Sequence, residues 1–455
     1  MKQRSMQEGM RKAIPIMVAA LLAVAAFAVV FAAADADDGN GFDDPLGAGE
    51  TFTAVAAGNQ FSLALRSDGT VWAWGSNGYG KLGIGGGDGK NTPQQVSGLT
   101  GITAIAAGYD SAFAIKSDGT LWAWGYNGRG QLGDGTDIDR NRPVQITTMT
   151  GTTAIASGHS FTIALKSDGT VWTWGSNSYG QLGDGGAIVS GSMRSTPQQV
   201  TGLSGITSIA AGYDCSFAVN ADKTIMAWGD NTYGQLGINS HGASTSTSAP
   251  VKVHGAGDVG FLSDVKMVTA GIYHTTAVKN DGTVWSWGYN LNGQLGDGTT
   301  TSKDTPVLVS GLAGVVKVSA RLYHTLAVKS DGAVYGWGQG GSGRLGNGTT
   351  DSSSTPVQVL GAGGTGFMTG VTDIGAGYDH SIILSNGTVW TFGYNGNGQL
   401  GIGTTTNSSI PVQVTFPASA GGGGGGGGIS VLLIIAVVAV IAIAGAAVYF
   451  FKFRK

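Results

Sequence analysis

Cysteine and charge are both scarce in this 455-residue chain. Cys215 is the single cysteine, so no disulfide can form within the chain, and only 12% of the residues are charged. No H-E-x-x-H or G-x-S-x-G segment occurs, and neither paired carboxylates nor a nucleophile constellation stands out. We therefore expect no enzymatic activity, no cofactor and no metal site.

Positive charge is missing from the middle of the chain. Seven of the 25 lysines and arginines, but only one of the 28 acidic residues, lie in residues 1–12 and 452–455. The remainder therefore has a net charge near −9, although the whole chain has −3. A surface of that sign repels phosphate backbones, so we expect no nucleic-acid partner.

Glycine, in contrast, is abundant, with 81 residues. The glycines fall at fixed places in a segment that occurs seven times and first reads SDGTVWAWGSNGYGKLG, from Ser67 to Gly83. The second aromatic residue of each copy is Trp74, Trp124, Trp174, Trp228, Trp287, Trp337 or Phe392, at steps of 50 to 59 residues. A period in that range indicates an array of supersecondary units.

Each copy reads as a set of short strands. Asp-Gly between apolar runs predicts a hairpin, and the alternation in residues 70–75 places both tryptophans on one face of a strand. A later strand opens with a proline, as at Pro93, which suits an outer edge. Seven four-stranded antiparallel units predict an all-β fold, a seven-bladed β-propeller over residues 51–416. We expect Pro411–Val414 to complete the blade that begins at Thr51, so that N- and C-terminal strands close the ring.

The repeat resembles a known family. The pattern D-G-x-V-x-x-W-G followed by G-Q-L-G is similar to the regulator-of-chromosome-condensation (alpha-tubulin-suppressor-like) repeat, across residues 51–416. The resemblance implies a seven-bladed propeller, often closed by strands from both termini. It implies less about function, because members include nuclear exchange factors for a small GTPase, enzyme inhibitors and surface proteins.

The family also tends to carry a histidine seven residues before the hairpin aspartate. His274 and His324 match that register, and His380 lies one residue away from it. The remaining copies have Phe61, Ser111, Phe161 and Cys215 instead. These positions lie on different blades, so we expect them to pack the blades together rather than to bind a metal.

The ends of the chain differ from the repeats. Residues 1–34, basic and then apolar, predict a signal peptide or an N-terminal membrane anchor, and residues 35–50 an acidic tether. Residues 417–428 predict a glycine-rich linker, residues 429–451 a transmembrane helix, and residues 452–455 a basic cytoplasmic tail. The propeller would then lie outside the cell on a single-pass protein, or a two-pass protein if the N-terminal segment is retained.

Tyrosines fall at two connections of the repeat that an up-and-down blade places at one end. The candidate binding face comprises Tyr79, Tyr109, Tyr126, Arg129, His159, Tyr179, Tyr213, Tyr233, Tyr273, Tyr289, Tyr323, Tyr378 and Tyr394. Tyrosine and arginine anchor many protein interfaces. The alternative is that these tyrosines pack the loops against one another. Asn347, Asn386 and Asn407 begin N-x-[ST] sequons and are candidate glycosylation sites.

These features favour a membrane-tethered extracellular propeller, a monomeric ring that binds an unknown extracellular protein or glycan through one loop face. Two alternatives stay open. The chain could be a structural cell-envelope protein whose propeller only spaces or packs. It could also be an enzyme with a polar site in the central channel, which a channel lined by perturbed carboxylates would favour.

Overall fold

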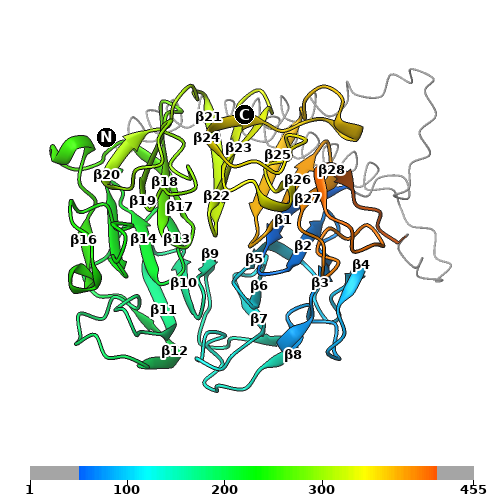
Figure 1. Ribbon diagram of the computed structural model, residues 1–455. Helices are drawn as coiled ribbons and strands as arrows, with labels where there is room; N and C mark the ends of the chain where they lie inside the picture. The colour runs from blue at the N-terminus through cyan, green and yellow to red at the C-terminus, as the bar shows by residue number, and fades with distance from the viewer. Residues whose placement is uncertain (1–50, 418–455) are drawn as a thin grey trace, which may run out of the picture. The chain divides into compact units, whose positions relative to one another are not determined.

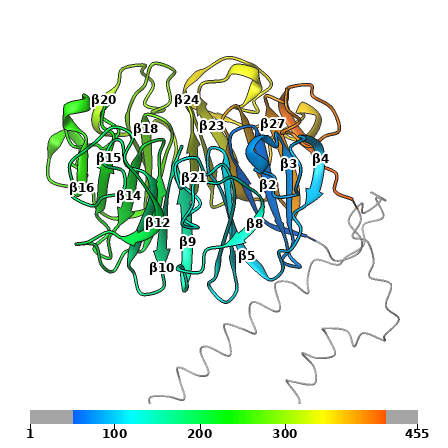
Figure 2. The same cartoon turned by 90° about the horizontal axis from the view of Figure 1, so that it is seen from below.

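The structure, a computed structural model, describes residues 51–417. They form seven four-stranded antiparallel sheets, each built from four consecutive strands. Figure 1 looks down on the ring of blades, with first strands such as β5, β9 and β13 near the centre and fourth strands such as β12 and β16 at the rim. Figure 2 shows the blades from the side. The prediction of an all-β, seven-bladed propeller is confirmed.

The first four blades take up residues 52–252. Blade 1 has β1 (Phe52–Ala57), β2 (Phe61–Arg66), β3 (Val71–Gly75) and β4 (Lys90–Gln95). Blade 2 has β5 (Ile102–Ala107), β6 (Ser111–Lys116), β7 (Leu121–Gly125) and β8 (Arg140–Gln145). Blade 3 has β9 (Thr152–Ser157), β10 (Phe161–Lys166), β11 (Val171–Ser176) and β12 (Met193–Gln199). Blade 4 has β13 (Ser208–Ala211), β14 (Cys215–Val219), β15 (Ile225–Gly229) and β16 (Thr247–Lys252).

The last three blades follow the same order. Blade 5 has β17 (Val265–Ala270), β18 (His274–Lys279), β19 (Val284–Gly288) and β20 (Lys303–Leu308). Blade 6 has β21 (Val315–Arg321), β22 (His324–Lys329), β23 (Val334–Gly338) and β24 (Ser353–Gln358). Blade 7 has β25 (Val371–Ala376), β26 (His380–Ser385), β27 (Thr388–Gly393) and β28 (Ser408–Gln413). In residues 51–417 helix is limited to short 3-10 turns: η1 (Gly78–Gly80), η2 (Ala243–Thr245), η3 (Ala256–Asp258), η4 (Gly341–Gly343) and η5 (Ala362–Gly364).

The hairpin signal acts through a local hydrogen-bond motif. In blade 1 the Asp68 carboxylate accepts hydrogen bonds from the backbone N–H and the hydroxyl of Thr70, at 2.8 and 2.6 Å. Gly69 supplies the positive φ of +78° that the turn requires. Partial burial acts to raise the pKa of Asp68, but these hydrogen bonds outweigh it and lower the pKa. The motif recurs at Asp118 and Asp168, so the Asp-Gly-Thr triplet is explained by the turn itself.

The tryptophan and G-Q-L-G segments join neighbouring blades. In blade 3, the buried Trp174 donates from Nε1 to the backbone oxygen of Gln131 in blade 2, at 2.8 Å. The Thr162 hydroxyl donates to the same oxygen, also at 2.8 Å. A side chain on Gly133 would meet the indole nitrogen at 2.7 Å, so only glycine lets the loop lie this close. Equivalent indole bonds come from Trp74, Trp124, Trp228, Trp287 and Trp337.

Ring closure differs from the prediction. β28 pairs with β27 in its own blade, and β4 is the fourth strand of blade 1, so no strand is exchanged between the first and last blades of the described chain. The ring closes through contacts between the two blades instead, which include backbone hydrogen bonds from Phe52 to Gly387 and from Tyr378 to Gly58, both at 3.1 Å, and side-chain contacts. Trp74 donates to the backbone oxygen of Gln399 at 2.9 Å, as at the other seams. Phe416, which follows β28, packs on blade 1 with its ring centroid 4.1 Å from that of Phe52.

The three histidines occupy one structural position and pack blades together. Each opens the second strand of its blade, opposite a glycine that recurs in every blade, and His380 aligns with the others because its hairpin is one residue shorter. His380 Nε2 lies 2.8 Å from the Ser62 hydroxyl of blade 1. That hydroxyl donates its proton to Gln399, so the imidazole must be the donor. The expected blade-packing role is confirmed.

The fourth strands begin about three residues earlier than expected, and the proline lies inside them, where the ladder register shifts, as at Pro93.

The predicted signal peptide or anchor, tether and transmembrane helix fall outside the described residues, as does the linker except its first residue. Within residues 51–417, no helix is long and apolar enough to cross a membrane.

Candidate functional site

The loops after the first and third strands of each blade lie at one end of the propeller, here called the tyrosine face. The thirteen candidate residues all lie on these loops. Rings from the two kinds of loop touch: the centroids of Tyr233, after a third strand, and Tyr273, after a first strand, are 4.4 Å apart. None of the thirteen is fully buried.

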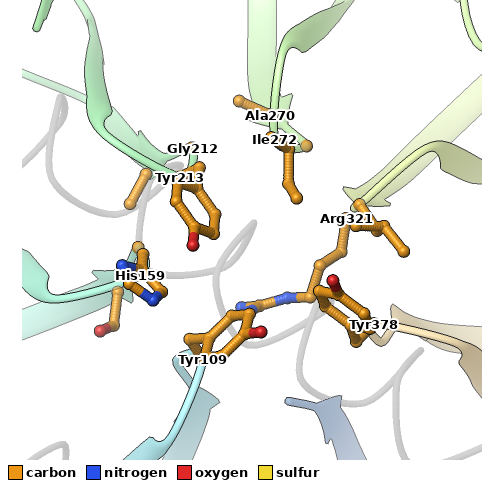
Figure 3. Close-up of a pocket in the computed structure, with 13 residues that line it drawn as sticks. Tyr109, His159, Gly212, Tyr213, Ala270, Ile272, Arg321 and Tyr378 are labelled. Atoms are coloured by element: carbon orange, nitrogen blue, oxygen red, sulfur yellow. The ribbon is translucent and has the colours of Figure 1, made fainter. Parts of the chain in front are cut away.

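Four of these residues form an inner cluster around the mouth of the central channel: Tyr109, His159, Tyr213 and Tyr378 (Figure 3). His159 stacks on Tyr213 at 4.2 Å, and Tyr109 meets Tyr378 edge-on at 5.4 Å. Burial lowers the pKa of His159 and raises the pKa of Tyr213 to about 12. At neutral pH the cluster therefore presents an uncharged imidazole and protonated phenols.

Tyr273 and Tyr323 belong to a different cluster. In their blades the residue after the first strand's glycine position is Ile272 or Leu322, and the tyrosine comes one residue later. That shift takes both rings away from the channel mouth, to where they meet Tyr233 and Tyr289 at centroid distances of 4.4 to 6.5 Å. The sequence analysis did not separate these two tyrosine positions.

The most exposed candidates lie on the outer part of the face. The exposed fractions of Tyr79, Tyr179 and Tyr233 are 54%, 41% and 38%, and Arg129 is also exposed. All four occupy the same place in the loop after the third strand. Tyr79 contacts Tyr126 at 4.7 Å. Tyr394 begins its loop like Tyr126 and is half-buried, so it belongs to the part of the face that packs.

Charged pairs and a related neutral contact cross the seams on this face. Lys81 Nζ lies 2.6 Å from the Asp110 carboxylate, and Arg344 lies 2.8 Å from Asp379. In blade 3 the same loop position is the neutral Gln181, which donates to Asp214 at 2.9 Å. Burial, and then the nearby negative charge of Asp230, raise the pKa of Asp214 to about 7. Asp214 therefore titrates near neutral pH because burial and Asp230 outweigh the hydrogen bond from Gln181.

The central channel begins beneath the inner cluster. It holds a cavity of about 240 Å³, lined mainly by alanine, valine and isoleucine from the first strands. Its lining includes no carboxylate from the described residues. The one charged residue in that lining is Arg321, at the end of β21, which sequence reasoning missed. The available signal was that six copies of the repeat have glycine at this position and the copy in blade 6 has arginine.

The remaining candidate sites are metal centres and the three glycosylation sequons. Within residues 51–417, no three His, Cys, Asp or Glu side chains converge as metal ligands would. Asn386 lies in the hairpin turn of blade 7 with a φ of 48°, and Asn347 and Asn407 lie in loops after third strands. Asn407 accepts a backbone hydrogen bond from Asn395 at 2.8 Å.

Comparisons with known proteins agree with the fold. The RCC1-like domain matches residues 44–383, and the regulator of chromosome condensation (RCC1) repeat matches residues 371–399 and 386–423. Human HERC6, a probable E3 ubiquitin-protein ligase, is 34% identical over 125 residues, which cover 27% of this chain and 12% of HERC6. Human HERC2, an E3 ubiquitin-protein ligase, is 32% identical over 261 residues, 57% of this chain and 3% of HERC2. The chain thus spans a small part of the length of these relatives.

A solved structure is also similar. The crystal structure of Prp20p from Saccharomyces cerevisiae has a TM-score of 0.61 and 22% identity, and the match covers 72% of this chain and 80% of that one. At this identity the likeness supports the fold alone.

Proposed function

This chain belongs to the RCC1-like domain family, as its repeats indicated, and we propose that its propeller binds a partner protein through the tyrosine face. The observation that carries the proposal is the row of exposed side chains at one loop position, Tyr79, Arg129, Tyr179 and Tyr233. Buried loop packing cannot account for residues that keep this much exposed surface. Tyrosine and arginine in such positions are typical anchors of protein interfaces.

A solved structure of this fold gives a precedent for binding. Prp20p has binding properties to Gsp1p and histones, so a propeller of this fold can serve as a protein-binding module. The cavity in the channel is lined mainly by apolar side chains, with Arg321 as the one charged residue and no carboxylate in that lining, so this cavity does not favour a channel enzyme. The partner here need not resemble those of Prp20p.

We favour a protein partner over a glycan because the exposed candidates are spread widely over the face. The cavity at the channel mouth measures only about 20 Å³, and two open hollows of about 470 and 380 Å³ lie among the loops after the third strands, the second beside Tyr233. The exposed side chains are instead spread over blades 1 to 4. A broad surface with scattered anchors is what a folded partner would cover.

We place the propeller outside the cell, tethered to the membrane. This part of the proposal rests on the sequence: residues 429–451 are uncharged and apolar, and Lys452, Arg454 and Lys455 follow them. Protease added to intact cells should then remove the repeats and spare the C-terminal tail. Full protection of the repeats in cells with an accessible surface would overturn the placement.

Interface mutants test the binding face. The double variant Tyr179→Ala, Tyr233→Ala in the full chain should reduce capture of a partner by cross-linking and mass spectrometry. Loss of hot-spot tyrosines typically costs about 2 kcal/mol or more in binding. The control is Ser117→Lys with Ser167→Lys, two exposed residues at the opposite end for which no side-chain hydrogen bond is seen. Asp118 and Asp168 are poorer controls because they hold the hairpins.

The two variants separate the outcomes. A partner that is lost with the tyrosine pair and kept with the serine pair supports the proposal. A partner kept by the folded tyrosine variant, or lost equally from both variants, contradicts it.

A further inference from the structure

Arg321 departs from a glycine position of the repeat. The other six blades have Gly58, Gly108, Gly158, Gly212, Gly271 and Gly377 there. None of the six has a positive φ, so their backbone does not demand glycine. The lack of space demands glycine instead: a side chain on Gly271 would meet the His274 imidazole at 2.3 Å, and one on Gly377 would meet His380 at 2.4 Å. An arginine here therefore needs a local change of backbone.

Blade 6 makes that change. β21 continues through Arg321, which pairs with His324, and Leu322 takes a φ of 48° to turn the chain. Around the rest of the ring, first loops of neighbouring blades are joined by backbone hydrogen bonds at six of the seven seams, as from Tyr378 N–H to Gly58 at 3.1 Å. In residues 51–417, the seam between blades 6 and 7, beside Arg321, has none. The repeat is altered in several ways to admit one cation.

The guanidinium group lies in the channel without a carboxylate partner. It reaches across from blade 6 to blade 2, where Nη2 donates to the backbone oxygen of Ala107 at 2.7 Å. No acidic side chain of the described residues lies within 4.0 Å of it, and the nearby Asp110 is paired with Lys81. Burial lowers the pKa of Arg321 to about 10, with Tyr109 and Asp110 opposing the shift. Arg321 is half-buried, and a charge withdrawn from water is costly unless it is paired.

Two other cations of the molecule have the carboxylate partner that Arg321 lacks. Lys81 and Arg344, both nearly buried, each hold a carboxylate across a seam. Arg321 has the inner cluster above it instead: its guanidinium extends toward Tyr109 and Tyr378 beneath the rings (Figure 3). The phenols and the uncharged His159 can add hydrogen-bonding groups beside the cation, so the site is suited to an anion.

We propose that the channel mouth binds a carboxylate of the partner protein, with Arg321 as its counter-ion. This inference rests on the proposed function, because the carboxylate arrives with the partner seated on the tyrosine face. The cavity of about 20 Å³ is close to the size of one small polar group, too small for a whole acidic sugar. About 10–15 Å³ holds one water, so a carboxylate at the end of a flexible side chain, or at a chain terminus, can place one oxygen in this cavity.

Small carboxylates test the site without any partner. The full chain, solubilised in mild detergent, is titrated with acetate and with neutral acetamide at constant ionic strength, while the Arg321 guanidinium NMR signal is followed. Acetate should shift the signal to saturation and acetamide should not. N-acetylglycine and N-acetylglutamic acid amide then compare a terminal with a side-chain carboxylate. Binding of either one supports the site.

Variants give the matched controls. Arg321→Gly restores the residue of the other six blades, so it should fold, and by a reporter on Tyr378 it should bind acetate at least about tenfold more weakly. Arg129→Gln removes an exposed charge of the same face and should leave acetate binding unchanged. Equal shifts by acetate and acetamide, or undiminished binding by folded Arg321→Gly, would overturn the inference. Because acetate binding needs no partner, failure of the partner-capture experiment leaves this test standing, and the reverse also holds.

Discussion

The seams between blades and the tyrosine face are built from the same repeat, yet they differ in how faithfully the repeat is kept. At the seams, an indole donates to a backbone oxygen of the preceding blade at six of seven positions, with distances of 2.8 to 3.0 Å. On the face, the first loops carry tyrosine, histidine, asparagine, isoleucine or leucine, and one glycine has become Arg321. The repeat sequence is therefore kept where residues pack neighbouring blades together, and it varies in the first loops, where the candidate site lies.

The seams should carry most of the stability. Trp174→Ala removes a fully buried ring and its bond to Gln131, and should lower the free energy of unfolding by roughly 3–5 kcal/mol. Trp172→Ala, two residues earlier on the same face of β11 but only half-buried, is the control and should cost clearly less. Denaturant unfolding of both variants gives the comparison. Equal losses would show that the seam has no special role.

The closing seam should be as strong as the others. Phe416→Ala removes the contacts with Phe52, Trp72 and Trp74 at centroid distances of 4.1 to 5.8 Å. Because Phe416 is buried, the expected loss is about 3 kcal/mol, seen as a lower melting temperature. An unchanged melting temperature would mean that blades 7 and 1 are held together elsewhere.

Acid should weaken the contacts between blades that His274, His324 and His380 make before it weakens the other contacts between blades. Burial lowers the pKa values of His274 and His380 to about 3 and that of His324 well below its usual value, so all three stay neutral in the folded protein. Unfolded histidines gain protons below about pH 6.5. Their stability contribution is therefore complete above that pH and is lost as pH falls toward 3. Each histidine adds up to about 1.4 kcal/mol per pH unit.

Hydrogen exchange can locate that loss. Between pH 7 and 5, amide protection corrected for intrinsic rate should fall more in β22 and β26 than in β6 and β10, where Ser111 and Phe161 replace histidine. His380→Phe should make the acid unfolding curve shallower by one proton. A uniform loss across the ring, or an unchanged slope in His380→Phe, would contradict the assignment.

The opposite pH dependence belongs to the seam between blades 3 and 4. Because the pKa of Asp214 is about 7 when folded and near 3.9 when unfolded, its contribution to stability is present at low pH and is lost as pH rises through 7. Gln181→Lys would supply the cation that Lys81 supplies to Asp110, so the variant should be more stable than the parent at pH 8. Less stability at pH 8 would show that the lysine cannot reach Asp214.

The sequence predicts the blades well because their signals are local. Asp-Gly-Thr forms its own hydrogen bonds, and alternation assigns Trp72 and Trp74 to one strand face. Ring closure was not predictable in this way, since an edge strand carries no mark of which blade it pairs with. The split of the tyrosines into two clusters depends on a one-residue shift between Tyr213 and Tyr273, and the bond from Arg321 to Ala107 spans 214 residues of sequence.

The smallest effect on stability is expected on the tyrosine face, and it tests the central claim most directly. The measurement is the free energy of unfolding of the Tyr179→Ala, Tyr233→Ala double variant, compared with that of Trp174→Ala under the same conditions. Because both tyrosines keep about two fifths of their surface exposed, the double variant should stay within about 1 kcal/mol of the parent. A loss as large as that of Trp174→Ala would contradict the account, because these tyrosines would then be packing residues and not a binding face.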